Sequence, residues 1–259
     1  MQRVLFHSTI FGPIHSRRLG TSLGINLLPD DGKICSFDCL YCEAGYNAQG
    51  HGTTGVPSRE DVARLLGEKL AAMKAAGEHL DVITFSGNGE PTLHPDFEGV
   101  IDDTIALRNR YFPEVKISVL TNSTRLGSES VHRALSKVDN NILKLDSAIA
   151  DTVQALDRPA PGYDLSAVID RIASFGRQGI VQTMICRGEH DGKPVDNSTE
   201  AEINALIETY LRIMPGEIML YTIDRPTPEV NLRRVPREEL EAIAARITAA
   251  TGIPVQVSA

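Results

Sequence analysis

Short apolar segments alternate with longer segments of mixed polarity along this chain of 259 residues. The apolar segments suit strands that are buried on both faces, as in a parallel sheet covered by helices. We therefore predict strands at residues 22–28, 81–86, 115–120, 141–145, 180–185, 217–223 and 254–257.

The segments between these strands predict helices. The first of them opens with Ser58-Arg-Glu-Asp61, a capping-box pattern in which polar side chains satisfy the free amides of a helix start. The predicted helices cover residues 58–76, 96–110, 128–137, 165–178, 199–214 and 237–251. Two polar, glycine-containing stretches, 45–55 and 188–198, are predicted to be mobile loops.

Six successive βα units favour an α/β fold, with parallel strands joined by right-handed helical crossovers. Eight such units close a complete (β/α)₈ barrel, so six units predict an open, partial (β/α)6 barrel of the TIM-like type. The sequence shows no internal repeat, low-complexity tract or linker, and we expect residues 1–259 to form a single domain.

The charge balance is acidic, because 26 Lys and Arg face 34 Asp and Glu and give a formal net charge of −8. Proteins that bind long nucleic acids usually present a basic face, so this balance counts against a large RNA partner without excluding one. No apolar stretch approaches the roughly 20 residues that span a bilayer, and the first residues lack the pattern of a signal peptide. We expect a cytoplasmic protein with no membrane partner.

Three of the four cysteines lie close together, as Cys35, Cys39 and Cys42, whereas Cys186 is far away in the sequence. Iron–sulfur clusters prefer thiolate ligands, and three thiolates would bind three irons of a 4Fe–4S cluster and leave the fourth iron open. An open metal position indicates a site for chemistry rather than a structural site. The alternative is a zinc site with His51 as the fourth ligand, and Cys186 is expected to be a buried structural cysteine.

Tyr41 precedes the third cysteine, where its ring can pack against an adenine base. The pattern Cys-x₃-Cys-x-aromatic-Cys after a first barrel strand resembles the loop of radical S-adenosylmethionine (SAM) enzymes, and the six βα units extend this resemblance over essentially the whole chain. The resemblance implies a 4Fe–4S cluster on Cys35, Cys39 and Cys42, with SAM bound at the open iron. One electron, from a donor such as flavodoxin or ferredoxin, would cleave SAM to methionine and a 5′-deoxyadenosyl radical that abstracts hydrogen from a substrate.

The second predicted strand ends in Gly87-Asn88-Gly89-Glu90, at the edge where ligands of parallel sheets bind. This turn resembles the Gly-Gly-Glu motif that orients the SAM ammonium in the superfamily, although Asn88 replaces the first glycine. Glu90 or a nearby carbonyl would accept hydrogen bonds from the ammonium, and Gly89 would let the backbone approach closely. An ordinary glycine-rich turn is the alternative.

Polar residues at the ends of later strands complete the predicted SAM site. By resemblance, Asn122, Asp146 and Ser147 would contact the SAM ribose or carboxylate, and Arg158 would pair with the carboxylate. These residues also suit helix N-caps, turns and a surface salt bridge, so both interpretations stay open. Lys144 would be an ion-pair partner of Asp146 or, if buried, a nucleophilic amine.

The segments 11–26, 85–93 and 221–226 resemble a group of small single-cluster proteins related to the wyosine-tRNA synthetases. Those synthetases carry additional amino-terminal cysteines, which this chain does not have before Cys35. We expect a small-molecule or nucleoside substrate, although RNA is an alternative if arginines form a phosphate-binding rim. The arginines in question are Arg17, Arg18, Arg225, Arg233, Arg234 and Arg237.

Two other functions are compatible with the same pattern. The first is an activating enzyme that abstracts hydrogen from a glycine of a partner protein. The second is a non-enzymatic metal-binding or redox-sensing module. The sequence identifies neither the substrate nor a catalytic residue.

Overall fold

The computed structural model describes residues 3–16 and 18–259. Its strands are β1 (Ile10–Ser16), β2 (Gly20–Ile25), β3 (Val82–Phe85), β4 (Lys116–Thr121), β5 (Asn140–Lys144), β6 (Gly179–Met184), β7 (Cys186–His190), β8 (Lys193–Asp196), β9 (Glu217–Tyr221), β10 (Arg233–Arg234) and β11 (Val255–Ser258). Its α-helices are α1 (Arg59–Ala76), α2 (Phe97–Tyr111), α3 (Glu129–Lys137), α4 (Ala150–Leu156), α5 (Leu165–Ala173), α6 (Glu200–Ile213) and α7 (Arg237–Thr251).

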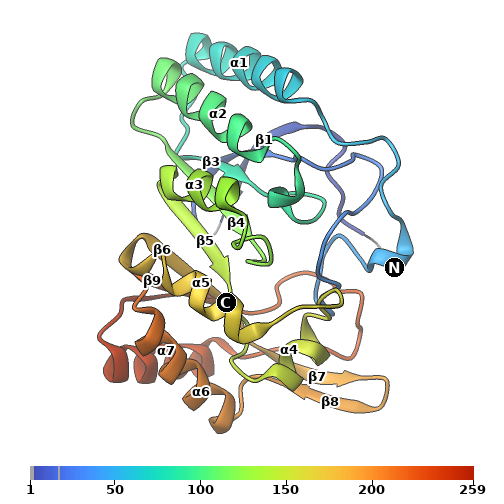
Figure 1. The fold of residues 1–259 in the computed structure, drawn as a ribbon, viewed down its shortest axis with the longest axis vertical. Coiled ribbons are helices and arrows are strands. Elements are labelled where there is room, and N and C mark those ends of the chain that lie inside the picture. Colours follow the sequence, from blue (N-terminus) through green and yellow to red (C-terminus); the bar gives the residue numbers. More distant parts are fainter. Residues whose placement is uncertain (1–2, 17) are drawn as a thin grey trace.

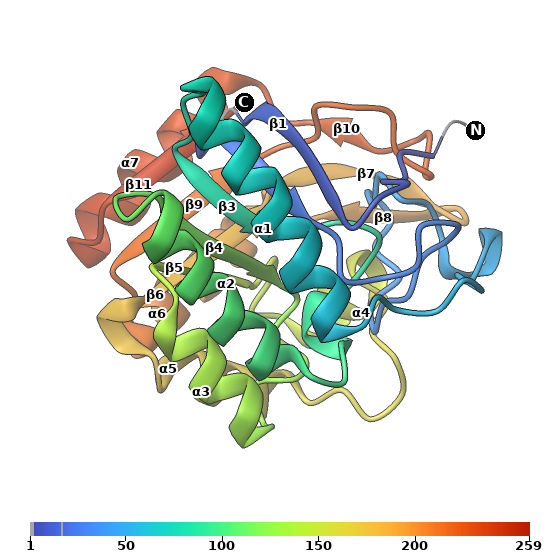
Figure 2. The same cartoon turned by 90° about the horizontal axis from the view of Figure 1, so that it is seen from above.

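An eight-stranded sheet, in the order β1-β2-β3-β4-β5-β6-β9-β11, forms the centre of the described chain. From β2 to β11 the neighbouring strands are parallel, whereas β1 pairs with β2 in the antiparallel sense. Figure 1 shows α1, α2, α3, α5, α6 and α7 following one another along one face of the curved sheet, and Figure 2 shows the same layers from above. The predicted α/β fold with an open partial (β/α)6 barrel is confirmed.

The helices cover the sheet because each presents an apolar stripe to it. In α1, Val62, Leu66 and Leu70 recur at helical spacing and are almost completely buried. Ser58 begins this helix by accepting a hydrogen bond from the Asp61 amide, as the capping pattern predicts. Together with the strands, these helices build one large apolar core between the sheet and its helical layer.

The stretch 188–198, predicted to be a mobile loop, instead contributes to a β-hairpin of β7 and β8. At its tip, Asp191 and Gly192 have φ angles of 51° and 73°, the left-handed conformation that a two-residue hairpin turn requires. The loop prediction was wrong because Asp-Gly is itself a hairpin signal. Strand β1 and helix α4 were not predicted, and a 3₁₀ turn (Asn47–Gln49) lies within the stretch 45–55.

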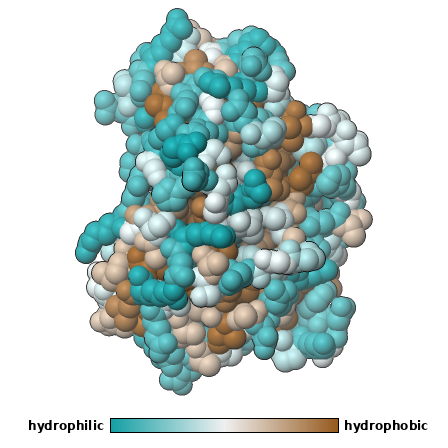
Figure 3. Space-filling view, in the orientation of Figure 1, coloured by the Kyte–Doolittle hydropathy of each residue, from teal (hydrophilic) through white to brown (hydrophobic). Residues whose placement is uncertain are grey.

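The molecular face seen in Figure 3 is mainly hydrophilic, and its hydrophobic side chains form small separate groups. Among the described helices, none combines the length and the apolar character that a membrane span requires. The organisation of residues 1–259 as a single domain stays a prediction.

Candidate active site

The cysteine loop (residues 33–45) follows β2 and lies at the edge of the sheet where β3 and β4 end. One anchor is the turn after β3: the Ile34 amide donates to the Asn88 carbonyl at 3.0 Å, and the Glu90 amide donates to the Ile34 carbonyl at 3.1 Å. The other anchor is α4, where the Leu40 amide donates to the carbonyl of the last helical residue at 2.9 Å. Backbone hydrogen bonds therefore fix the loop on both sides.

The three cysteines of this loop differ in exposure, since Cys39 is buried and Cys35 and Cys42 are half-buried. The Cys35 Sγ accepts hydrogen bonds from the Phe37 amide and from Nδ2 of Asn122, each at 3.5 Å. Burial raises the pKa of the Cys35 thiol to about 12, so a metal that binds this sulfur must displace its proton.

The arrangement of possible metal ligands distinguishes two kinds of site. Within residues 3–16 and 18–259, no three His, Cys, Asp or Glu side chains are grouped as a single metal ion requires. His51, the alternative zinc ligand, is exposed. A 4Fe–4S cluster makes a different demand, because each thiolate binds a different iron. Three thiols in one anchored loop meet this ligand requirement of a cluster.

Lys33 is a buried cation next to the cysteines that no sequence pattern indicates. Its side chain is 1% exposed, and its Nζ donates to the Gly45 carbonyl at 2.9 Å and lies 3.6 Å from Oδ1 of Asp38. Burial opposes the charge of Lys33, but Cys42, the other two cysteines and Asp38 raise its pKa overall. The ammonium is therefore placed to offset the negative charge of thiolates in this loop.

Glu90 is buried, and its carboxylate accepts four hydrogen bonds from its surroundings. The donors are the amide and hydroxyl of Thr92 at 3.0 and 2.5 Å, the Thr121 hydroxyl at 2.7 Å, and the Asn122 amide at 2.6 Å. Burial raises the pKa of Glu90, and the four donors act in the opposite direction. Glu90 thus joins the turn after β3 to the end of β4. Asn122 continues this connection to the cysteine loop, because its Nδ2 donates to Ser36 Oγ at 2.9 Å.

At Gly89 the backbone lies close to a neighbouring segment, and this segment is the cysteine loop. Gly89 has a φ of 133°, and a Cβ at this position would lie 1.9 Å from the Ile34 carbonyl oxygen. Its neighbour Asn88 is completely buried and donates from Nδ2 to the Phe6 and Pro29 carbonyls at 2.8 Å. The Asn88 side chain therefore fastens the amino-terminal segment and does not face the cysteines.

Ser147 and Cys186 were also singled out in the sequence, and the structure places them differently. Ser147 donates from Oγ to Oε2 of Glu202 at 2.6 Å, so it is directed at α6. Cys186 begins β7 and is completely buried, as predicted, in an apolar cluster that also contains Leu40 of the cysteine loop. Burial raises the pKa of its thiol.

A buried polar group, the Lys144 cluster, lies beside the cysteine loop and consists of Lys144, Tyr41, Asp146 and Asp157. The Lys144 ammonium contacts the Tyr41 hydroxyl and the Asp146 carboxylate, and it lies 2.8 Å from Oδ1 of Asp157. The predicted ion pair of Lys144 with Asp146 is confirmed. Because two carboxylates face one ammonium, one negative charge is in excess. Burial raises the pKa of Asp157 to about 7, and this effect outweighs the attraction of Lys144 for the carboxylate.

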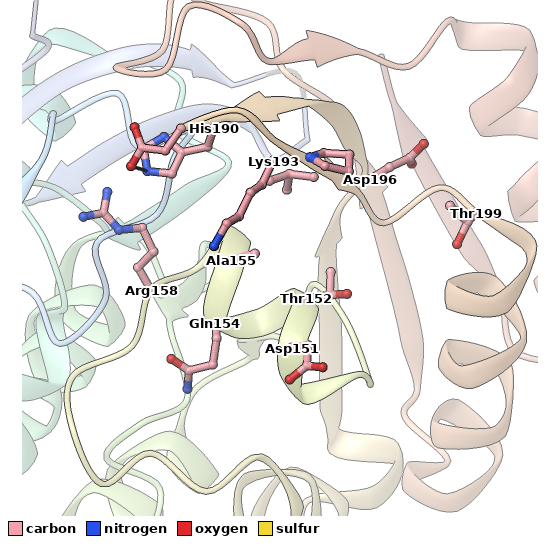
Figure 4. Close-up of a pocket in the computed structure, with 12 residues that line it drawn as sticks. Asp151, Thr152, Gln154, Ala155, Arg158, His190, Lys193, Asp196 and Thr199 are labelled. Atoms are coloured by element: carbon pink, nitrogen blue, oxygen red, sulfur yellow. Dashed lines mark ion pairs between the residues drawn. The ribbon is translucent and has the colours of Figure 1, made fainter.

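Arg158 lies outside the Lys144 cluster, at a cavity of about 730 Å³ between α4 and the β7–β8 hairpin. Figure 4 shows Arg158 and His190 on one side of this cavity, with Lys193 extending toward α4. Arg158 also forms an ion pair with Asp38 at 3.4 Å, which links it to the cysteine loop. The charged residues that line the cavity are Asp151, Arg158, His190, Asp191, Lys193 and Asp196. With His190 neutral, three carboxylates face two cations, so the lining is slightly acidic.

Comparison with known families and proteins gives a consistent result. Residues 31–197 match the family described as the Radical SAM superfamily. The chain is similar to the UPF0026 protein slr1464 of Synechocystis sp., with 30% identity over 275 residues that cover 95% of each chain. It is also similar to a protein named GTPase Obg from Brachyspira hyodysenteriae, with 28% identity over 237 residues. That match covers 90% of the present chain but only 32% of the relative.

Solved structures share the fold at low sequence identity. A radical SAM methyltransferase from Sphaerobacter thermophilus superposes with a TM-score of 0.65 and 19% identity, over 92% of this chain and 65% of the methyltransferase. SuiB of Streptococcus suis, bound to S-adenosylmethionine, gives a TM-score of 0.60 and 14% identity over 91% of this chain and 46% of SuiB. At these identities the likeness concerns the fold, which is the curved half-barrel described above.

Proposed function

Because the chain belongs to the radical SAM superfamily and to the UPF0026 family, and is a radical SAM enzyme, we propose that Cys35, Cys39 and Cys42 hold a 4Fe–4S cluster. With SAM at its open iron, such a cluster supplies the electron that yields methionine and a 5′-deoxyadenosyl radical, which abstracts hydrogen from the substrate. Family membership argues against the alternative of a non-enzymatic metal-binding module.

The observation that carries this proposal is that hydrogen bonds fix the cysteine loop to two elements, the turn after β3 and helix α4. The turn after β3 anchors Ile34 and the end of α4 anchors Leu40, so Cys35 and Cys39 between them are held at the mouth of the half-barrel. Cys42 follows two residues later, and its amide donates to the Cys39 carbonyl at 3.1 Å. Ligands of such sheets bind at the carboxyl ends of the strands. The buried Lys33 ammonium supports a site with several thiolates, because it lowers the cost of their charge.

We propose that SAM lies against the turn after β3 and the ends of β4 and β5. The Gly89 backbone approaches the loop most closely and would bind the SAM ammonium through a carbonyl, whereas the saturated Glu90 carboxylate would position the turn. Asn122 contacts Cys35 of the loop, and Asp146 contacts the hydroxyl of Tyr41, which belongs to the loop. These three residues would bind the polar groups of SAM.

The remaining predicted SAM contacts have indirect roles in this proposal. Asn88 and Ser147 would support the site from behind, since their side chains bind the amino-terminal segment and α6. Arg158 reaches the cysteine loop through Asp38 and would approach the SAM carboxylate only if that ion pair opened.

A small-molecule or nucleoside substrate suits the charges better than a long RNA does. Of the predicted arginine rim, Arg225 pairs with Glu43 at 2.7 Å and Arg237 pairs with Glu241 at 3.4 Å. Acidic partners thus neutralise part of the rim, in line with the net charge of −8. Arg17 lies outside the described residues. The reducing electron would come from a small redox protein such as flavodoxin or ferredoxin.

Anaerobic reconstitution with iron and sulfide tests the proposal. The wild-type chain should bind about four irons and, after reduction with dithionite, should release methionine and 5′-deoxyadenosine from SAM. Cys35→Ala, Cys39→Ala and Cys42→Ala should each lose the cluster absorbance and the cleavage. Cys186→Ala is the matched control and should keep both, because Cys186 is buried in another element. Full iron and SAM cleavage in Cys39→Ala would refute the assignment.

A further inference from the structure

Arg18 lies in the turn between β1 and β2, and this turn reaches the opposite edge of the sheet. Nε2 of Gln256, on β11, donates to the Arg18 carbonyl at 3.3 Å. The Arg18 guanidinium lies over the Tyr221 ring, 4.7 Å from its centroid. Since Tyr221 ends β9, the guanidinium is at the carboxyl end of the strands, on the same side of the sheet as the cysteine loop.

The guanidinium of Arg18 is not fully satisfied within the protein. Its Nη1 is buried and has no hydrogen-bond partner among the described residues. A buried charged donor without an acceptor is unfavourable, and native proteins rarely leave one unpaired. Arg225, on the same side of the barrel mouth, differs because its Nη1 donates to Glu43 at 2.7 Å. Unlike Nη1 of Arg225, Nη1 of Arg18 therefore has no carboxylate oxygen that accepts its hydrogen bond.

A cavity of about 50 Å³ adjoins this guanidinium, and Tyr41 and Met184 are among its lining residues. Its volume is enough for one carboxylate or phosphate group but too small for a whole substrate. Tyr41 connects the cavity to the cysteine loop, because it lies between Cys39 and Cys42 in the sequence. A group bound here would thus lie one side chain away from the loop.

The other charges at this cavity leave Arg18 available for an anion. Glu43, Asp224 and Arg225 also line it. Glu43 is neutralised by Arg225, and Asp224 has a partner of its own. The Lys144 ammonium interacts with the same Tyr221 and is held by Asp146 and Asp157.

We propose that Arg18 binds an anionic group of the substrate, a carboxylate or a phosphate, and so anchors the substrate at the mouth of the half-barrel with its reacting part directed at the cysteine loop. The guanidinium suits this role because its planar fork binds two oxygens of one anion. Stacking on the Tyr221 ring holds the planar guanidinium in place. The substrate class is therefore a small organic acid or a phosphorylated compound. The assignment of this anion as part of the substrate rests on the function proposed above.

Calorimetric titration of the anaerobically reconstituted enzyme with acetate and with inorganic phosphate, at constant ionic strength, tests the site. Arg18→Gln should weaken binding of the preferred anion roughly ten- to a hundredfold, the effect of losing a charge-assisted hydrogen bond. Arg18→Lys should bind with intermediate affinity, because it keeps the charge and loses the fork. Arg212→Gln is the matched control and should bind like the wild type, because Arg212 is an exposed arginine of α6 that pairs with Asp170 and does not line the cavity. Tighter binding of acetate indicates a carboxylate substrate, and tighter binding of phosphate indicates a phosphorylated one.

The proposal is overturned if neither anion binds the wild type, or if Arg18→Gln and Arg212→Gln weaken binding equally. The iron content and melting temperature of each variant show whether it has folded. If Arg18→Gln does not fold, the comparison of Arg18→Lys with the wild type still decides the test. Reductive SAM cleavage is measured on the same wild-type preparation. Anion binding without SAM cleavage would refute the proposed function and leave the anion site standing, whereas cleavage without anion binding would refute only the site.

Discussion

At Glu90, four hydrogen-bond donors from Thr92, Thr121 and Asn122 converge on one buried carboxylate. The side-chain amide of Asn88 is likewise satisfied within the protein. Its Oδ1 accepts from the Phe6 amide, and its Nδ2 donates to the Phe6 and Pro29 carbonyls. Both side chains sit in the turn that resembles a SAM-binding motif, yet both are bound by the protein itself. They act on the site by holding the backbone of this turn in place.

Replacing Glu90 by Ala should lower the free energy of unfolding by about 3 kcal/mol or more, because several buried donors lose their acceptor at roughly 1–3 kcal/mol each. Glu90→Gln should cost less, because the amide keeps one acceptor oxygen. Urea unfolding measures both effects. Glu208→Ala, on the exposed side of α6, is the control and should stay within about 0.5 kcal/mol of the wild type. Equal stabilities of Glu90→Ala and Glu208→Ala would contradict the structural role of Glu90.

The cysteine loop has little regular secondary structure of its own and takes its conformation from the elements beside it. The turn after β3 binds it at Ile34, and α4 binds it at Leu40. Lys33 adds a third constraint by donating to the Gly45 carbonyl inside the loop. The geometry of the thiols therefore depends on contacts with segments that are distant in sequence.

Gly89→Ala should displace the cysteine loop and reduce the iron bound on reconstitution. The added methyl group would lie 1.9 Å from the Ile34 carbonyl oxygen, so the two backbones must separate. Gly77→Ala is the control, because this glycine also has a positive φ of 67° but a Cβ there meets no atom within 4 Å. Iron per chain and cluster absorbance measure the effect. If both variants bind as much iron as the wild type, Gly89 does not control the loop.

The whole molecule divides into a helix-covered half-barrel and a mouth built from irregular segments. The large apolar core lies between the sheet and the helices, and a smaller apolar cluster that includes Leu40, Leu156 and Val195 lies at the mouth. Figure 1 shows α4 and the β7–β8 hairpin together at this end of the molecule. The half-barrel is therefore stabilised by its own core, whereas the mouth also depends on contacts with the cysteine loop.

Removing iron from the reconstituted enzyme with a chelator should loosen the mouth selectively. Amides of residues 33–52 should exchange hydrogen faster, because metal–thiolate bonds no longer cross-link the loop. Amides of β3, β4 and β5 should keep their protection, since their hydrogen bonds lie within the sheet. Hydrogen exchange followed by mass spectrometry measures both regions. Equal acceleration in the loop and in these strands would show that the metal stabilises the whole fold instead.

Regularities that are local in the chain were enough to predict the half-barrel, and they also led to the proposed cysteine site. Strand and helix periods depend on neighbouring residues, and the spacing of Cys35, Cys39 and Cys42 is a property of eight consecutive positions. The β7–β8 hairpin was missed although its turn is also local, because the polar Asp191-Gly192 pair suits a loop as well as a hairpin.

The partners of the polar residues, by contrast, follow from the fold. Glu90 meets Asn122, Lys144 meets Asp157, and Arg18 reaches Tyr221 because the sheet brings the ends of separate strands together. A buried polar group needs a partner, but many distant groups can satisfy it, so sequence alone leaves the choice open. The burial of Lys33 and the missing acceptor of Arg18 have the same origin, since exposure is a property of the packed chain.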